Sequence, residues 1–160
     1  MGESTGTIRF AAFEDLERVN VLRKQVNDLH VFGKPEIFKE GFPDELQAYV
    51  YAVFGDPDKR ILVYEIDGTI CAFAVLHFID RPETPYMRER VFLDIDEFCV
   101  DAAYRRRGIA TEMIAFIRSY ARNNGIGRIE LNMWEFNRDA LEFYEKVGFV
   151  TYRRYMEMNV

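Results

Sequence analysis

Three consecutive arginines, Arg105, Arg106 and Arg107, precede Gly108 where the sequence predicts the start of a helix. A helix N-terminus carries about half a positive charge, so cationic side chains are unfavourable there unless an anion is bound. Backbone N–H groups at a glycine-containing helix start can hold a phosphate, and the arginines can neutralise it. The segment ending at Thr111 therefore predicts a site for a phosphate-bearing ligand.

Acidic side chains precede this turn in a predicted strand, although aspartate is depleted in strands. A carboxylate placed beside a ligand site can accept a proton from a reacting group, so these residues are candidates for a general base. Asp96 is our preferred base, with Asp94 and Glu97 as alternatives; a solvated sheet edge would explain these residues without catalysis. Strict alternation places Asp94, Asp96, Phe98 and Val100 on one face, and a β-bulge would exchange the faces beyond it.

Hydrophobic periodicity and turn signals predict the element order β-α-α-β-β-β-α-β-α-β. The predicted strands are 7–12, 60–66, 69–79, 91–100, 128–134 and 149–159, and the predicted helices are 14–30, 43/44–54, 108–124 and 137–147. Asp67-Gly68 predicts a hairpin, and the later β-α-β unit predicts a parallel pair. We expect a mixed α/β sheet with helices on both faces, in one domain over residues 1–160.

The net charge of −6 and the 49% hydrophobic content indicate a folded, acidic protein. This charge disfavours a nucleic-acid partner and favours cationic substrates such as amines. Cys71 and Cys99 lie in apolar runs outside any CxxC pair, and His30 and His77 are isolated. We therefore expect buried reduced thiols and no metal. Without a long apolar run or a signal peptide, we expect a cytoplasmic protein with no membrane partner.

Two motifs occur in order along the chain, Arg105–Ala110 and Asn137–Phe149. The first resembles the Arg/Gln-x-x-Gly-x-Gly/Ala signature of the GNAT family of N-acetyltransferases, and Ile95–Val100 is similar to the strand that precedes it there. Asn137–Phe149 resembles the second hallmark, Asn-x-x-Ala-x-x-Phe-Tyr-x-x-x-Gly-Phe. The close resemblance covers about 93–150, and residues 1–90 fit by element order alone. It implies a GNAT-like fold whose fourth and fifth strands splay apart.

The resemblance also implies acetyl-CoA as acyl donor. The residues implied to bind it, mostly through backbone groups, are Phe98, Cys99, Val100, Arg105, Arg106, Arg107, Gly108, Ile109, Ala110, Thr111 and Asn137. Asn137 is explained equally well as a helix N-cap. Tyr144 is at the position of the general acid that assists the leaving thiolate, for which a pKa of about 10 is suitable. A core aromatic is the alternative interpretation of Tyr144.

The expected reaction is direct attack of a primary amine on the thioester. A small molecule, a polyamine and a peptide or protein amine all fit as acceptor, and a homodimer is compatible with the sequence. Segment 30–42 is similar to one that borders the acceptor in some bacterial members, and Phe32, Phe38, Tyr86 and Trp134 are candidates to line the pocket. The alternatives are another acyl-CoA as donor, or a non-catalytic acyl-CoA sensor.

Overall fold

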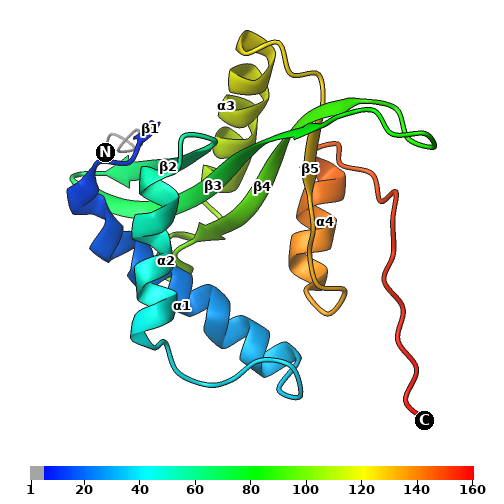
Figure 1. Ribbon diagram of the computed structural model, residues 1–160. Helices are drawn as coiled ribbons and strands as arrows, with labels where there is room; N and C mark the ends of the chain where they lie inside the picture. Colours follow the sequence, from blue (N-terminus) through cyan, green and yellow to red (C-terminus); the bar gives the residue numbers. More distant parts are fainter. Residues whose placement is uncertain (1–5) are drawn as a thin grey trace.

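The structure is a computed structural model that describes residues 6–160. Its centre is a five-stranded sheet of order β1-β2-β3-β4-β5 (Figure 1). The strands are β1 (Thr7–Phe10), β2 (Lys59–Ile66), β3 (Thr69–Arg81), β4 (Arg90–Val100) and β5 (Ile129–Leu131). β1 to β4 are antiparallel and β5 is parallel to β4, which confirms the predicted mixed sheet.

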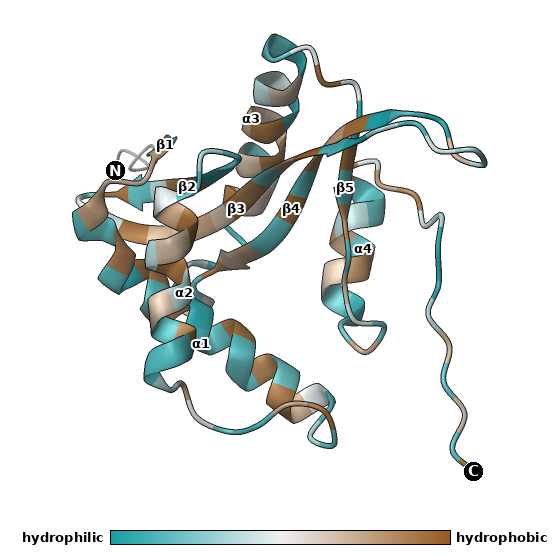
Figure 2. Ribbon diagram, in the orientation of Figure 1, coloured by the Kyte–Doolittle hydropathy of each residue, from teal (hydrophilic) through white to brown (hydrophobic). Residues whose placement is uncertain are grey.

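Helices cover both faces of the sheet, as predicted. They are α1 (Leu16–Gly33), α2 (Asp44–Gly55), α3 (Ile109–Asn123) and α4 (Arg138–Lys146), with short 3-10 turns at Phe13–Asp15 and Ala102–Tyr104. One core joins α1 and α2 to the sheet, and a second core, under α3, also receives apolar side chains of α4. Figure 2 shows the apolar residues concentrated in the strands between these helices.

The predicted hairpin between β2 and β3 is present. Asp67 and Gly68 have φ angles of 48° and 76°, the left-handed conformation that a tight two-residue hairpin turn requires. β3 and β4 extend into a long second hairpin that projects beyond the sheet (Figure 1).

A β-bulge interrupts β4 at Asp96. Val75 of β3 pairs with Glu97, whereas the next residue, Leu76, pairs with Ile95, so Asp96 has no partner in the register. The bulge reverses which residues point to each face of β4.

The predicted set of residues sharing one face of β4 is therefore wrong beyond Asp96. Ile95 belongs to the core under α3, and after the bulge Phe98 and Val100 pack against that same core. Asp96 instead contacts α2, on the opposite face. Strict alternation failed because one extra residue shifts the two-residue period.

The predicted sixth strand is also absent. Residues 149–160 form no regular element, and the chain runs past α4 as an extended tail (Figure 1). The backbone N–H of Phe149 donates to the Tyr144 carbonyl at 2.9 Å, and no backbone hydrogen bond joins residues 150–160 to any other described residue. The tail has the sequence pattern of a strand, but no neighbouring strand pairs with it. Among the smaller differences, β1 and β5 are shorter than predicted and α1 continues to Gly33.

Candidate active site

The turn after β4 presents a row of unpaired backbone N–H groups. The N–H groups of Arg105 through Gly108 donate to no described residue, and the first N–H of α3 with a partner is that of Glu112, 3.0 Å from the Gly108 carbonyl. The N–H groups before it at the helix start have no intrahelical acceptor. Gly108 has a left-handed φ of 80°, and the space over its Cα is open. The geometry is that of an anion-binding turn.

The three arginines are exposed around this turn. The Arg105 Nε donates to the Val100 carbonyl at 3.3 Å, and the Arg107 guanidinium lies 5.0 Å from the centre of the Tyr104 ring. Arg106 has a positive φ of 62°, unusual for a residue with a side chain. The structure therefore brings the predicted arginines and free N–H groups together.

Asp101 fixes the turn to α1 and was not among the predicted residues. Its carboxylate accepts from the Ala103 N–H at 3.0 Å, from Gln25 Nε2 at 3.2 Å and from the Arg18 guanidinium. Burial acts to raise the pKa of Asp101, but these hydrogen bonds hold it below its ordinary value. Gln25 also accepts from the Ala102 N–H at 3.1 Å. The available sequence signal was the spacing of Arg18 and Gln25, which places both on one face of α1.

β4 and β5 separate beside this turn, as the resemblance implied. They pair only from Leu93–Ile95 to Ile129–Leu131, while β4 continues to Val100. The segment from Asp96 to Val100 therefore has an open edge on the β5 side. An extended ligand arm can lie along such an edge with main-chain pairing, as an added strand does.

Tyr144 lies on α4 near this open edge. Its ring centre is 6.5 Å from that of Phe98 and 5.5 Å from that of Phe149. Burial, reinforced by the nearby Cys99 thiol, raises the pKa of Tyr144 to about 12. No described residue forms a hydrogen bond with its hydroxyl. Tyr144 is therefore neutral at pH 7, with a proton to donate.

Both cysteines are free and buried, as predicted. Burial raises the pKa of Cys99 to about 12, so its thiol stays protonated and is a poor nucleophile. The Cys71 thiol donates to the Thr69 carbonyl at 3.2 Å.

The three candidate bases on β4 have different environments. Asp96 is exposed and accepts from the Tyr49 hydroxyl of α2 at 2.9 Å. Asp94 is partly buried, and burial together with the Asp96 charge raises its pKa to about 6. Glu97 is bound by Arg23 through bonds of 2.9 and 3.1 Å. Because Arg23 is 7% exposed, this pair holds α1 on β4, and Glu97 is the weakest of the three candidates.

Aromatic rings gather between α1, the segment after it and the loop after β5. Phe38 lies 4.8 Å from His30 and 5.1 Å from Trp134, measured between ring centres. Burial lowers the pKa of His30. Phe136 also joins the group, so close to Gly33 that a Cβ there would lie 2.2 Å from its ring. His30 and Phe38 belong to the predicted segment 30–42, whereas Phe136 was not among the predicted residues.

Phe32 and Tyr86, the other two aromatic candidates for the acceptor pocket, do not join the group that contains Phe38 and Trp134. Their exposed fractions are 87% and 86%, and Tyr86 is in the loop of the long hairpin.

Asn137 caps α4 by accepting from the Ala140 N–H at 3.2 Å. Its N-cap interpretation is thus confirmed, while its contact with a cofactor stays a prediction.

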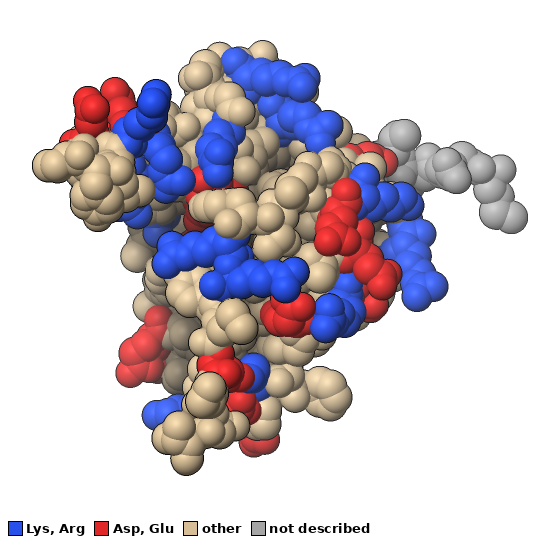
Figure 3. All heavy atoms as spheres, turned by 90° about the vertical axis from the view of Figure 1, so that its right-hand side faces the viewer, with Lys and Arg blue, Asp and Glu red and all other residues tan. Residues whose placement is uncertain are grey.

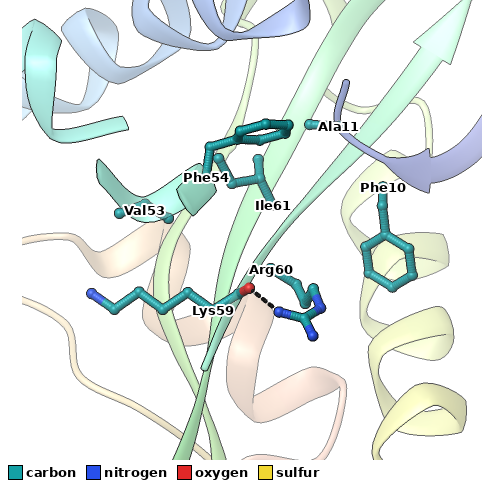
Figure 4. Close-up of a pocket in the computed structure, with 7 residues that line it drawn as sticks. All are labelled: Phe10, Ala11, Val53, Phe54, Lys59, Arg60 and Ile61. Carbon is teal, nitrogen blue, oxygen red and sulfur yellow. Dashed lines mark hydrogen bonds between the residues drawn. The ribbon is translucent and has the colours of Figure 1, made fainter. Parts of the chain in front are cut away.

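Two surface hollows lie away from the predicted residues. Figure 4 shows one of them, lined by Phe10, Ala11, Val53, Phe54, Lys59, Arg60 and Ile61. The other is lined by Asp58, His77, Phe78, Ile79, Asp80, Arg81 and Val91. Within residues 6–160, no group of His, Cys, Asp and Glu side chains could hold a metal ion. None of the helices in these residues combines the length and the hydropathy that a transmembrane span needs.

Comparison with known proteins identifies the family. Residues 23–149 match the model of the acetyltransferase (GNAT) family, so the chain belongs to this family. Its structure is similar to that of a mutant form of the BH1408 protein from Bacillus halodurans, with a TM-score of 0.92 and 30% identity over 96% of this chain and 99% of that one. A predicted acetyltransferase from Clostridium acetobutylicum, solved with acetyl-CoA, has the same fold, with a TM-score of 0.71 and 23% identity over 97% and 96% of the two chains.

A curated relative, N-alpha-acetyltransferase 30 of Xenopus laevis, is 25% identical over 96% of this chain and 50% of its own length. The chain thus spans about half of that relative. GNAT enzymes use acetyl-CoA as the acetyl donor. The family explains why the free N–H row and the open edge of β4 lie together.

Proposed function

We propose that this protein transfers the acetyl group of acetyl-CoA to a primary amine by direct attack. The observation that carries the proposal is the continuity of two unpaired backbone segments. The open edge of β4 leads directly into the N–H row of Arg105–Thr111. The first suits the pantetheine arm and the second suits the pyrophosphate, so one ligand would satisfy both.

The two candidate catalytic groups act from opposite faces of β4. Asp96 lies on the α2 face, where it can accept a proton from the incoming amine, directly or through water. Tyr144 contacts Phe98 on the α4 face, where its hydroxyl can donate to the departing sulfur. The bulge at Asp96 produces this division, because Asp96 and Phe98 would otherwise share a face.

The acceptor would meet two kinds of surface, the acidic side chains of β4 and the aromatic group near α1. Asp94 and Asp96 attract a cationic amine, and the group containing Phe38 and Trp134 offers apolar contact. We therefore propose a small or peptide-borne amine as acceptor, and the protein itself would act without nucleic acid or membrane.

The test measures acetyl-CoA affinity by calorimetry, and CoA thiol release with a panel of polyamines, amino acids, aminoglycosides and peptides. We expect binding, and release with at least one acceptor. Tyr144→Phe should lower kcat about tenfold or more with little change in KM. Tyr120→Phe, a matched change on α3, should leave both unchanged. Absence of acetyl-CoA binding would overturn the proposal. Binding without release of the CoA thiol for any amine would favour the alternative, a non-catalytic acyl-CoA sensor.

A further inference from the structure

The Asp96 carboxylate is bonded to a single side chain in the part of the chain that the structure describes. Asp96 is the extra residue of the β4 bulge, so no residue of β3 lies opposite it. Its Oδ2 accepts from the Tyr49 hydroxyl of α2 at 2.9 Å, and no described residue donates to its Oδ1. Because Asp96 is exposed, this one bond is what restrains the carboxylate, and Oδ1 is left for an incoming amine.

The Tyr49 ring is held in place by two cations. The Arg23 guanidinium lies 5.1 Å from the ring centre and Lys59 Nζ lies 5.4 Å from it, distances at which a cation is attracted to an aromatic face. Arg23 is itself nearly buried and bound to Glu97, so its position does not depend on Asp96. Tyr49 is therefore fixed by contacts other than the one it makes with the candidate base.

The direction of the hydrogen bonds around Tyr49 is determined by charge. Burial raises the pKa of Tyr49, so its hydroxyl keeps its proton at neutral pH. Burial acts to lower the pKa of Lys59, but the bond to Tyr49 holds it above its ordinary value, so Lys59 stays charged. An ammonium group can only donate and a carboxylate can only accept. Lys59 Nζ therefore donates to the Tyr49 oxygen, at 3.3 Å, and the Tyr49 hydroxyl must donate to Asp96.

This row of three side chains is assembled from three elements. Tyr49 is on α2, Lys59 begins β2 and Asp96 is on β4, and Figure 1 shows α2 lying over one face of the sheet. Successive residues of a strand point to opposite faces, and Figure 4 shows the Lys59 side chain extending away from that of Arg60. Arg60 Nη1 is bonded instead to the carbonyls of Pro57 and Lys59. Lys59 therefore takes part in the row, whereas its neighbour Arg60 does not.

The orientation of Asp96 matters because its surroundings do not supply it. Burial, together with the charge of Asp96, raises the pKa of Asp94 to about 6, so the two carboxylates lie close enough to repel each other. Figure 3 shows basic and acidic side chains mixed over the side of the molecule that carries α4 and the tail, so no field of one sign there steers a cationic amine. A local contact has to hold the Asp96 carboxylate in place.

We propose that Tyr49 is a positioning residue for acetyl transfer, and that Lys59 fixes the direction of its hydroxyl. With Oδ2 held by Tyr49, Asp96 presents Oδ1 to the amine. In the reaction the nitrogen–carbon bond forms and the carbon–sulfur bond breaks, while Asp96 takes a proton from the amine and Tyr144 gives one to the sulfur. Tyr49 touches none of the reacting atoms and acts through Asp96. Its role rests on the proposed acetyl transfer with Asp96 as the base.

The first experiment compares kcat and KM for CoA thiol release in matched variants. Tyr49→Phe keeps the ring between its cations and removes the hydroxyl, so kcat should fall about tenfold while KM for acetyl-CoA stays unchanged. Tyr51→Phe removes a hydroxyl from the same helix, where the ring lies 5.6 Å from that of Phe13, and should change neither constant. A Tyr49→Phe variant with full kcat would overturn the proposal.

A double-mutant cycle separates positioning from a purely structural role. Asp96→Asn should lower kcat about 100-fold, and adding Tyr49→Phe should lower it no further, because Tyr49 acts only through Asp96. A contact that merely holds α2 on β4 would instead give independent losses, which multiply in the double variant. Such multiplied losses would contradict the positioning role.

The third experiment tests Lys59. Lys59→Met keeps the apolar stem and removes the ammonium, so kcat should fall about threefold, and Lys59→Arg should restore most of it because a donor returns. Arg60→Met, the matched change on the next residue, should have no effect. Full kcat in Lys59→Met would show that Lys59 does not direct the hydroxyl.

The wild-type chain distinguishes failure of this role from failure of the proposed function. A wild-type chain that releases no CoA thiol with any amine would overturn the acetyl transfer and the role of Tyr49 together. Transfer by the wild type that Tyr49→Phe does not slow would overturn the role of Tyr49 alone.

Discussion

The turn Arg105–Thr111 and the tail 150–160 both expose unpaired backbone groups, but the two are supported differently. The turn is held by the buried Asp101 and by the left-handed Gly108. The tail is held to the rest of the chain by side-chain contacts such as Glu157 with Lys34 and Tyr152 with Glu130. A preorganised polar turn suits a small anion, whereas an extended segment held by a few side-chain contacts has no fixed set of N–H groups to offer one.

The largest effect is expected where the turn is held. Asp101→Ala should lower the free energy of unfolding by about 3 kcal/mol, because Arg18, Gln25 and the Ala103 N–H each lose one acceptor, at about 1 kcal/mol per hydrogen bond. Urea denaturation measures this change. Asp28→Ala removes the exposed pair with Lys24 and should cost less than about 0.5 kcal/mol. Equal losses in the two variants would mean that Asp101 does not fix the turn.

The turn's function in binding is tested at Gly108. A β-branched residue at φ 80° costs about 2 kcal/mol, so Gly108→Val should disturb the N–H row and weaken acetyl-CoA binding about 30-fold. Gly68→Val introduces the same strain at φ 76° in the β2–β3 hairpin, and there the affinity should not change. Calorimetric titration compares the two. Unchanged affinity in Gly108→Val would remove the turn from the ligand site.

A third prediction concerns the partly buried carboxyl of Asp94, whose charged form lowers the stability of the fold. Because its folded pKa of about 6 lies above its ordinary value, this carboxyl makes the protein less stable as the pH rises from about 4 to 6. Asp94→Asn should therefore stabilise the fold at pH 8 by about 1 kcal/mol, a figure reduced for solvent screening of a half-exposed group, and have no effect near pH 3. Denaturation at the two pH values measures this difference. A larger gain in stability at pH 3 than at pH 8 would contradict burial of the charged carboxylate as the cause.

The smallest effect is expected in the tail. Tyr152→Phe removes one exposed hydrogen bond to Glu130 and should change the free energy of unfolding by less than about 0.5 kcal/mol. Urea denaturation of this variant and of the unchanged chain measures the difference. A loss above about 1 kcal/mol would show that the tail is packed as firmly as the turn, and the contrast between the two would fail.

The sequence determined the local chemistry of this protein. Four features depend only on neighbours within a few residues, so spacing alone predicted them. They are the arginine-glycine turn, the Asp67-Gly68 hairpin, the capping Asn137 and the amphipathic α3. The order of elements followed from the same local signals, and the second motif placed Tyr144 on α4.

Tertiary structure decided what depends on distant partners. The bulge at Asp96 follows from the register with β3, and it set the candidate base and acid on opposite faces. Arg23 neutralises Glu97 across 74 positions of sequence, and Gln25 reaches Asp101 across 76. A strand needs a neighbour as well as a pattern, so residues 149–159 have the sequence pattern of a strand and yet form no strand.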